Sequence, residues 1–345
     1  MAARVLSRIA IVTPVFNDWT SLEMLVQNIS HLYSGGPLTF QVVVVDDGSS
    51  APSDLAALTP ASTSCIAEVT VVRLAVNLGH QRAIAAGLSL VSAWNDIDAV
   101  IVIDSDGEDR PEDIAALRSA GIAHPGLAIL ARRARRSETS LFKAGYALYK
   151  LMFRALTGRT INFGNFSLLP MSAVRRLVHM PEAWNNMAAA LMRSRLPCTA
   201  IPVNRGRRYA GSSKMNLSSL IVHGLSAMSV WTDVIFVRVL LGAAGIAVLS
   251  LLGMLVVVAI RVFTSLAIPG WATTIFGDLL IILTQTLVLV IAASLTLLAG
   301  RSHRHFIPIA DSKAFLLPDG IALCKRPANV APAPPSECRG VSLGS

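Results

Sequence analysis

The chain has 345 residues and a formal net charge of +9, and 53% of its residues are hydrophobic. The mean hydropathy of +0.57 is higher than a soluble protein of this length needs. No nucleic-acid-binding motif accompanies the positive charge, and the four cysteines lack the spacing of a zinc site or a disulfide framework. We therefore expect a basic protein that works at a membrane, on its reducing, cytosolic side.

The first 120 residues alternate between strand and helix patterns. Short apolar, β-branched runs predict four buried strands, at residues 9–15, 41–45, 69–74 and 99–103. Apolar residues at helical spacing predict helices around residues 22–32 and 82–94, and Thr20 and Glu23 have the spacing of a capping box before the first. This alternation indicates an α/β fold with a mostly parallel sheet covered on both faces.

The chain after about residue 140 contains helices that are too apolar for a soluble domain. Residues 141–156 and 217–234 have the pattern of helices that lie in a membrane interface. The runs 239–260 and 279–299 contain no charged residue. As a helix each run is about 30 Å long, which is enough to cross the hydrocarbon core of a bilayer.

These patterns predict a domain order and an orientation. The order is a cytosolic α/β domain at 1–213, an interface helix at 214–235, a two-helix transmembrane region at 236–300 and a cytosolic tail at 301–345 whose end is disordered. Arg238 precedes the first span and Arg301 and Arg304 follow the second, whereas the connector carries only Arg261 and Asp278. By the positive-inside bias we expect a multi-pass protein of the cell membrane, with the active site and both termini in the cytosol.

Polar clusters follow the predicted strands, at residues 16–18, 46–49, 77–80 and 104–109. In an open parallel sheet, ligands bind beyond the carboxyl ends of the strands. Crowded carboxylates repel one another, so such a site is expected to hold a cation. Asp104 and Asp106 straddle one residue and offer the hard oxygen ligands that suit Mg²⁺ or Mn²⁺, and an ion there would neutralise a diphosphate leaving group. An isolated D-x-D pair is usually only a solvated turn.

The turn at residues 13–21, between the first strand and the first helix, contains no glycine. The G-x-G-x-x-G fingerprint of dinucleotide-binding proteins and the P-loop are both missing. These absences weigh against a dehydrogenase and against an NTPase.

Seven sequence blocks, spread over about residues 8–300, have a distinctive order and spacing: TPVFND, VVVVDDGSS, NLGHQRAIAAGL, VIDSDGEDRPEDI, RRARRSETS, NFGNFSLLP and RRYAGSSKMN. They resemble the family 2 glycosyltransferases, which have the GT-A fold. Within that family they resemble the membrane-bound polyprenyl-phosphate sugar transferases related to dolichol-phosphate mannose synthase. The resemblance implies that Asp104 and Asp106 are catalytic metal ligands and that Arg82 lies near the diphosphate. It implies a nucleotide-sugar site formed by Pro14, Asn17, Asp18, Asp47, Gly79, Arg82, Asp104 and Ser105.

Basic residues gather before each predicted interface helix, within residues 132–136 and 207–214. Arginine binds phosphate through two parallel hydrogen bonds, so two such clusters could clamp a lipid phosphate. We expect acceptor-phosphate binding by Arg132, Arg136, Arg208 and Lys214. The alternative is a generic attraction to anionic lipid, worth about 1 kcal/mol per residue near the surface.

Residue 165 departs from the pattern of the polyprenyl-phosphate transferases. Those proteins have a Gly-Asp-Phe block whose aspartate is suspected in catalysis, whereas this chain has Gly164-Asn165-Phe166. Asparagine cannot act as a base, but a phosphate monoester needs none because it is mostly dianionic at neutral pH. A hydroxyl acceptor would need one, and Asp109, with Glu108, is then the nearest candidate. Asn165 could also have a purely structural role.

The sequence thus predicts a metal-dependent, inverting transfer of a sugar from a UDP- or GDP-linked donor to a membrane polyprenyl phosphate. Two alternatives remain: a transferase that uses a hydroxyl acceptor on a glycolipid or polysaccharide, and a non-catalytic membrane protein that binds nucleotide sugars. A homo-oligomer is compatible with the sequence, and nucleic acid is not an expected partner.

Overall fold

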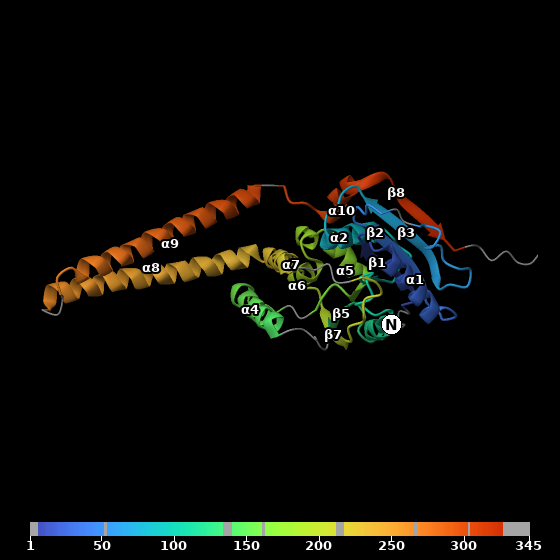
Figure 1. Ribbon diagram of the computed structural model, residues 1–345, viewed down its shortest axis with the longest axis horizontal. Coiled ribbons are helices and arrows are strands. Elements are labelled where there is room, and N and C mark those ends of the chain that lie inside the picture. Colours follow the sequence, from blue (N-terminus) through green and yellow to red (C-terminus); the bar gives the residue numbers. More distant parts are fainter. Residues whose placement is uncertain are drawn as a thin grey trace, which may run out of the picture.

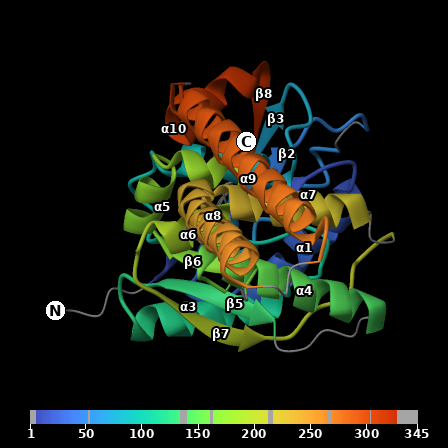
Figure 2. The ribbon, with the colours of Figure 1, turned by 90° about the vertical axis from the view of Figure 1, so that its left-hand side faces the viewer.

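Alternating strands and helices build a layered α/β domain, and two long helices project from it (Figure 1). Figure 2 looks along these two helices, with the domain behind them. The computed structural model describes residues 6–51, 54–133, 140–160, 163–211, 217–264, 268–302 and 304–326.

One mixed sheet of eight strands forms the centre of the described residues, in the order β7-β5-β6-β4-β1-β2-β3-β8. Its strands are β1 Arg8–Val15, β2 Thr39–Asp46, β3 Ile66–Leu74, β4 Ala99–Val102, β5 Ala128–Arg133, β6 Ser167–Pro170, β7 Cys198–Val203 and β8 Leu316–Lys325. Strands β4, β1, β2 and β3 are parallel neighbours, as are β5 and β7. Only β6 and β8 run antiparallel to their neighbours. The mostly parallel α/β sheet predicted from the sequence is confirmed.

Helices cover both faces of the sheet because successive residues of the central strands face opposite sides. In β1, Ile9 and Ile11 pack in one core layer, and Ala10 and Val12 pack in the other. The first layer includes α1 (Trp19–Tyr33) and α3 (Ile114–Ala123) with the 3₁₀ turn η1 (Pro111–Asp113) before it. The second layer is built from α2 His80–Val91, α5 Met171–Leu177, α6 Met187–Arg193, α10 Pro308–Asp311 and the 3₁₀ turns η2 Pro181–Trp184 and η3 Ser312–Phe315.

The predicted capping box at Thr20 is wrong. Helix α1 begins at Trp19, so Thr20 lies inside its first turn, and Asp18 occupies the N-cap position without a side-chain cap bond. The long apolar face of the helix fixes its start more strongly than a local capping signal does.

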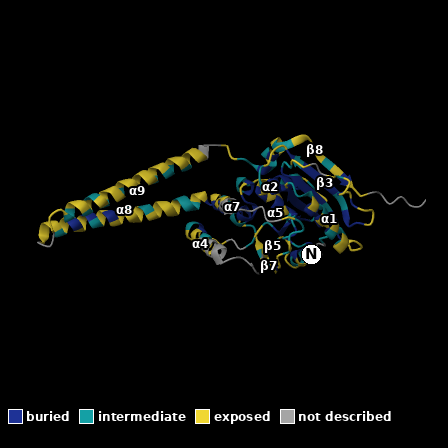
Figure 3. Ribbon diagram, in the orientation of Figure 1, coloured by how far each residue is buried: buried dark blue, intermediate teal, exposed yellow. Residues whose placement is uncertain are grey.

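The projecting pair consists of α8 (Thr232–Phe263) and α9 (Trp271–Ser302), and both are long and apolar enough to cross a membrane. Only 17% of the most apolar window of α8 and none of that of α9 is buried. Figure 3 shows exposed residues along most of both helices. A core helix of a soluble protein would be covered by other elements, so this exposure fits a bilayer-spanning pair.

Two further helices lie where the pair leaves the domain, α4 (Ser140–Thr157) and α7 (Leu217–Ser229). They correspond to the two predicted interface helices, although a short break after Ser229 separates α7 from α8.

Arginine side chains attach the helix pair to the domain. The guanidinium of Arg193 in α6 pairs with Asp233 in the first turn of α8 at 2.8 Å and donates to the Val230 carbonyl at 2.6 Å. Arg238, one turn further along α8, donates to the Ala155 carbonyl near the end of α4 at 2.6 Å. Charged arginine side chains donate hydrogen bonds to backbone carbonyls at these points. The root of the helix pair, the end of α8 next to the domain, is therefore fixed in orientation.

The segment after α9 returns to the domain and completes the sheet, which differs from the predicted tail at 301–345. Strand β8 pairs with β3 over most of its length, and Cys324 is buried in the core beside Val69. This strand has no strong pattern in the sequence because only one face of an edge strand is buried. Residues 327–345, whose end was predicted to be disordered, lie outside the described residues.

Gly87 provides a test of how closely α2 packs on the sheet. A Cβ atom at Gly87 would lie 2.6 Å from Val12 Cγ1 and 2.9 Å from Val45 Cγ2. We expect Gly87→Ala to lower the free energy of unfolding by about 1–3 kcal/mol, measured by chemical unfolding in detergent, because both neighbours are buried in the core. Gly245→Ala in α8 is the matched control, since a Cβ there meets nothing within 4 Å. An equal loss of unfolding free energy in both variants would contradict the close packing of α2 on the sheet.

Candidate active site

The carboxyl ends of β1, β2 and β4 bring most of the predicted site residues to one edge of the sheet. Asp47, directly after β2, is 3% exposed, and its two carboxylate oxygens accept the N–H groups of Leu78 at 2.7 Å and Gly79 at 2.9 Å. Burial raises the pKa of Asp47, and the two N–H donors act in the opposite direction. Asp47 therefore shapes the loop before α2 with both of its oxygens.

Asn17 joins the loop after β1 to the loop after β2. Its side-chain oxygen accepts the backbone N–H groups of Ser50 at 3.0 Å and Ala51 at 3.2 Å, and its own N–H donates to Ser49 Oγ at 2.8 Å. Asn17 adopts a φ of 50°, in the left-handed region that asparagine tolerates better than most residues. The structure thus shows Asn17 bracing two site loops.

Two more predicted donor-site residues contact each other at the same edge. The hydroxyl of Ser105, which is buried, donates to the Pro14 carbonyl at 3.1 Å. This bond ties the loop after β4 to the end of β1. Pro14, Asn17, Asp47, Gly79 and Ser105 therefore all lie in the loops that meet at this edge.

The loop after β4 presents its acidic residues in different ways. The side chains of Asp104 and Asp106 are 25% and 20% exposed, whereas Asp109 is buried. Asp109 accepts the backbone N–H of Asp104 at 3.3 Å, and Asp106 accepts that of Glu108 at 2.9 Å. Burial raises the pKa of Asp106. Asp104 and Asp106 thus remain accessible to a ligand, while Asp109 supports the loop from inside.

Arg208 lies against the same carboxylates. Its guanidinium is 3.0 Å from Asp106 Oδ2 and 3.7 Å from Asp18 Oδ2. The backbone N–H of Tyr209 donates to the Asp106 carbonyl at 2.9 Å, so this stretch of chain runs along the acidic loop. The structure therefore joins Arg208, predicted from its basic cluster, with Asp18 and Asp106, predicted from the strand ends.

The other predicted acceptor-binding residues are not joined to this cluster. Arg132 is exposed near the end of β5, and no hydrogen bond or ion pair within the described residues connects it to the acidic loop. Arg136 and Lys214 lie outside the described residues. Arg82 stands over the ring of Trp184, with its Cζ atom 5.8 Å from the ring centroid.

A series of hydrogen-bonded side chains, which the sequence did not predict, connects α6 with Asp104. The backbone N–H of Met187 donates to Gln81 Oε1 at 2.9 Å, so the other end of that amide, Nε2, faces Asn165 Oδ1 at 3.1 Å. The amide nitrogen of Asn165 consequently faces His80 Nε2 at 3.0 Å, and the same ring nitrogen is 3.1 Å from Asp104 Oδ1. Because a backbone N–H can only donate, Met187 sets the direction of the whole chain.

This network gives Asn165 a structural role and subjects the pKa of His80 to opposing effects. Both ends of the Asn165 amide are used in hydrogen bonds, so its role in the structure is to connect Gln81 with His80. Burial lowers the pKa of His80, but the surrounding carboxylates, chiefly Asp104, outweigh it and raise the pKa above its ordinary value. An amide N–H at Nε2 opposes protonation of that atom. The NLGHQ block was the available signal, but it does not show which side chains meet.

Asp104 and Asp106 fit a magnesium or manganese ion. Among the described residues there is no group of three or more His, Cys, Asp or Glu side chains arranged to hold a metal ion. Mg²⁺ is commonly bound by only one or two carboxylates, with water and substrate phosphates filling the other positions. Both carboxylates have a positively charged or titratable neighbour, Arg208 or His80, as expected where negative charge needs compensation.

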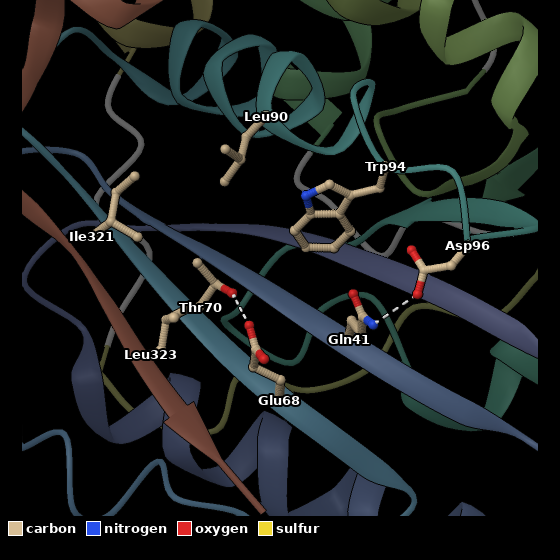
Figure 4. A pocket seen from close by; sticks show the side chains of 8 residues that line it. All are labelled: Gln41, Glu68, Thr70, Leu90, Trp94, Asp96, Ile321 and Leu323. Carbon is tan, nitrogen blue, oxygen red and sulfur yellow. Dashed lines mark hydrogen bonds between the residues drawn. The ribbon is translucent and has the colours of Figure 1, made fainter.

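Two hollows in the surface of the described residues lie away from this edge. A cavity of about 340 Å³ is lined by Leu90 and Trp94 on one side and by Ile321 and Leu323 of β8 on the other (Figure 4). Its floor includes Gln41 and residues of β3, at the ends of the strands opposite to the acidic loops. None of the predicted site residues lines it. The chemistry of the side chains therefore locates the site better than concavity does.

Comparison with known proteins agrees with the site chemistry. The family model "Glycosyl transferase family 2" matches residues 10–179, which include every one of the loops described above except that of Arg208. Residues 10–179, just under half of the chain, thus match a family 2 glycosyltransferase domain. The protein is therefore a glycosyltransferase, and its mostly parallel sheet with a D-x-D loop after β4 is the GT-A arrangement expected from the sequence.

Relatives of the transferase include two bacterial enzymes with the same name. The undecaprenyl-phosphate 4-deoxy-4-formamido-L-arabinose transferase of Yersinia enterocolitica serotype O:8 is 28% identical over 222 residues, covering 63% of this chain and 65% of that protein. The protein of that name from Yersinia pestis strain Pestoides F is 26% identical over 273 residues, covering 77% of this chain and 80% of the relative.

Solved structures similar to the transferase include those of two synthases. Glucosyl-3-phosphoglycerate synthase from Mycobacterium tuberculosis, in complex with Mn²⁺, UDP-glucose and phosphoglyceric acid, has a TM-score of 0.49 and 15% identity, covering 68% of this chain and 82% of that one. Mannosyl-3-phosphoglycerate synthase from Rubrobacter xylanophilus has a TM-score of 0.44 and 16% identity, covering 65% and 72%.

The Gln81 network of the transferase can be tested by its effect on stability. Gln81 is 8% exposed, and Gln81→Leu would leave the Met187 N–H and the Asn165 oxygen without these partners. We expect the free energy of unfolding to fall by about 1–3 kcal/mol in chemical unfolding. Gln41→Leu is the control, because its amide makes only a 3.5 Å contact with Asp96 at the surface, and a change within about 0.5 kcal/mol is expected. Equal changes in the free energy of unfolding of the two variants would contradict a structural role for the network.

Proposed function

We propose that the transferase moves a sugar, with inversion, from a nucleoside-diphosphate donor to a polyprenyl phosphate in the membrane. The observation that carries the proposal is the acidic loop after β4, where the accessible carboxylates of Asp104 and Asp106 lie beside the guanidinium of Arg208. The names of the Yersinia relatives support undecaprenyl phosphate as the class of acceptor.

The donor would bind over the loops that meet at the edge of the sheet. Asp104 and Asp106 would hold a Mg²⁺ or Mn²⁺ ion, which supplies charge neutralisation for the departing nucleoside diphosphate. Asp18 and Pro14 would contact the nucleoside, while Asn17 and Asp47 hold the loops around it through the hydrogen bonds described above. Gly79, with a φ of 94°, allows the loop before α2 to turn into the site.

The acceptor would be bound as a phosphate. The Arg208 side chain is 23% exposed beside Asp106, and its guanidinium would donate to a phosphate oxygen. The phosphate oxygen then attacks the anomeric carbon, and the bond from that carbon to the donor diphosphate breaks. Because a phosphate monoester is mostly dianionic at neutral pH, the reaction does not need a carboxylate at position 165.

The structure offers little support for a hydroxyl acceptor. Such an acceptor requires a base, and the nearest acidic side chains are both engaged. Glu108 pairs with Arg205 at 2.6 Å, and Asp109 is buried against the backbone N–H of Asp104.

The helix pair would anchor the transferase in the cell membrane. We place the catalytic domain and both chain ends in the cytosol, because Arg238 and Arg304 flank the pair on the domain side. The pairing of β8 with β3 supports this topology, because it brings the chain back to the domain after α9.

Asp106 provides the direct test of the proposed chemistry. Asp106→Asn removes one anionic metal ligand, and we expect turnover to fall by about 10²-fold or more. The measurement is Mn²⁺-dependent transfer of label from UDP- and GDP-sugars to undecaprenyl phosphate by purified protein in detergent. Asp96→Asn, which changes an exposed aspartate before β4, is the matched control and should retain activity. Full activity of Asp106→Asn would contradict the role of Asp106 as a metal ligand.

The pH dependence distinguishes the two classes of acceptor. With a phosphate acceptor we expect kcat/KM for the acceptor to rise with pH through about 6, because the dianion is the stronger nucleophile. Asn165→Asp should leave that midpoint unchanged, since no base is used. Label transferred to a non-phosphorylated glycolipid instead would support the hydroxyl alternative, and transfer to neither acceptor would leave only nucleotide-sugar binding.

A further inference from the structure

The first turn of α2 contacts two other parts of the chain, the acidic loop after β4 and residues 184–187. His80 lies 3.1 Å from Asp104, Gln81 accepts the N–H of Met187, and Arg82 stands over the ring of Trp184. This turn follows the loop that Asp47 binds, so its three consecutive side chains lie at the border of the proposed site. All three contacts lie within the α/β domain, but Trp184 also contacts the segment that follows α9.

Trp184 belongs to an aromatic cluster that includes the segment returning from α9. Its ring stacks on that of Phe306, with centroids 3.9 Å apart and an angle of 30° between the planes. Phe315 lies 5.8 Å from both rings. Phe306 follows Ser302, the last residue of α9, by only four positions. The end of the second apolar helix is thereby connected to α2 through two ring contacts.

Arg82 has the properties of a phosphate-binding residue in this setting. It is exposed, and no acidic side chain within the described residues forms an ion pair with it. A guanidinium that lies over an aromatic ring keeps its N–H groups at the edge available for a phosphate. Trp184 is 7% exposed, so the ring beneath Arg82 is fixed by its neighbours.

We propose that Phe306 is a positioning residue for phosphate binding: it fixes the Trp184 ring, and that ring orients Arg82 towards a substrate phosphate. This inference rests on the proposed transferase reaction, because the phosphate belongs to the donor diphosphate or to the lipid acceptor. The segment that returns from the membrane then has a direct effect on the site, in addition to completing the sheet.

The test compares Arg82→Ala, Phe306→Leu and the double variant in the full-length protein with Mn²⁺. Leucine retains apolar volume but has no ring face for Trp184. We expect each single variant to raise the KM for one phosphate substrate by roughly 3- to 10-fold, with kcat within about twofold, and the double variant to match Arg82→Ala. A higher KM for the nucleotide sugar would assign the donor diphosphate, and a higher KM for undecaprenyl phosphate would assign the acceptor.

Two controls separate positioning from general damage. Leu317→Ala changes an exposed residue of the same returning segment and should leave both KM values unchanged. Phe306→Tyr keeps the ring and should restore the wild-type KM, whereas a variant that only destabilises the fold would lower the active fraction and hence kcat. Unchanged KM values in Arg82→Ala or Phe306→Leu would overturn the inference. It would also be overturned if the increase in KM of the double variant equalled the product of the two single-variant increases.

Binding measurements make the outcome independent of turnover. Calorimetric titration of UDP and GDP with Mn²⁺ should show weaker binding in Arg82→Ala and Phe306→Leu by a similar factor if the donor is the source of the phosphate. If the wild-type protein binds nucleotide but transfers no sugar, the proposed function fails. The positioning inference would then be decided by whether both variants weaken nucleotide binding, and equal affinities would overturn it.

Discussion

Repulsion among the carboxylates at the carboxyl ends of β1, β2 and β4 has to be balanced before the loops there can come together. Different polar or charged groups compensate the negative charge of each carboxylate. Asp47 receives two backbone N–H groups, Asp109 receives one, and Asp106 shares Arg208 with Asp18. Asp104 has His80 beside it. These compensating groups come from residues 78–80, from Arg208 and from the acidic loop itself, so the charge distribution also dictates which segments meet at the site.

The sequence was sufficient for the parts of this arrangement that depend on local patterns. Runs of Val and Ile mark the central strands, and the acidic residues that follow them lie at one edge because parallel strands share a direction. The Gln81–Asn165–His80 chain could not be predicted, because its direction depends on a backbone N–H more than a hundred residues away. Arg82 was expected near the diphosphate, but its one aromatic contact, with Trp184, depends on tertiary packing.

Arginine has two separate uses in this protein. Arg193 and Arg238 are bound within the structure, where they join α6 and α4 to the root of the helix pair. Arg208 and Arg82 instead lie at the proposed site, where Arg208 contacts Asp106 and Asp18 and Arg82 is exposed over the ring of Trp184. A count of basic residues near a membrane therefore overstates the number available to lipid, and only the pattern of contacts separates the two groups.

The position of β8 in the chain also constrains how the protein is made. The sheet edge formed by β3 is covered by a strand that is synthesised only after both long apolar helices. A nascent chain therefore carries an incomplete domain, with Val69 and Val71 lacking their last neighbour, until the ribosome has passed residue 325. Completion of the catalytic domain is thus coupled to synthesis of the anchor, and a truncated product without the anchor would also lack a finished sheet.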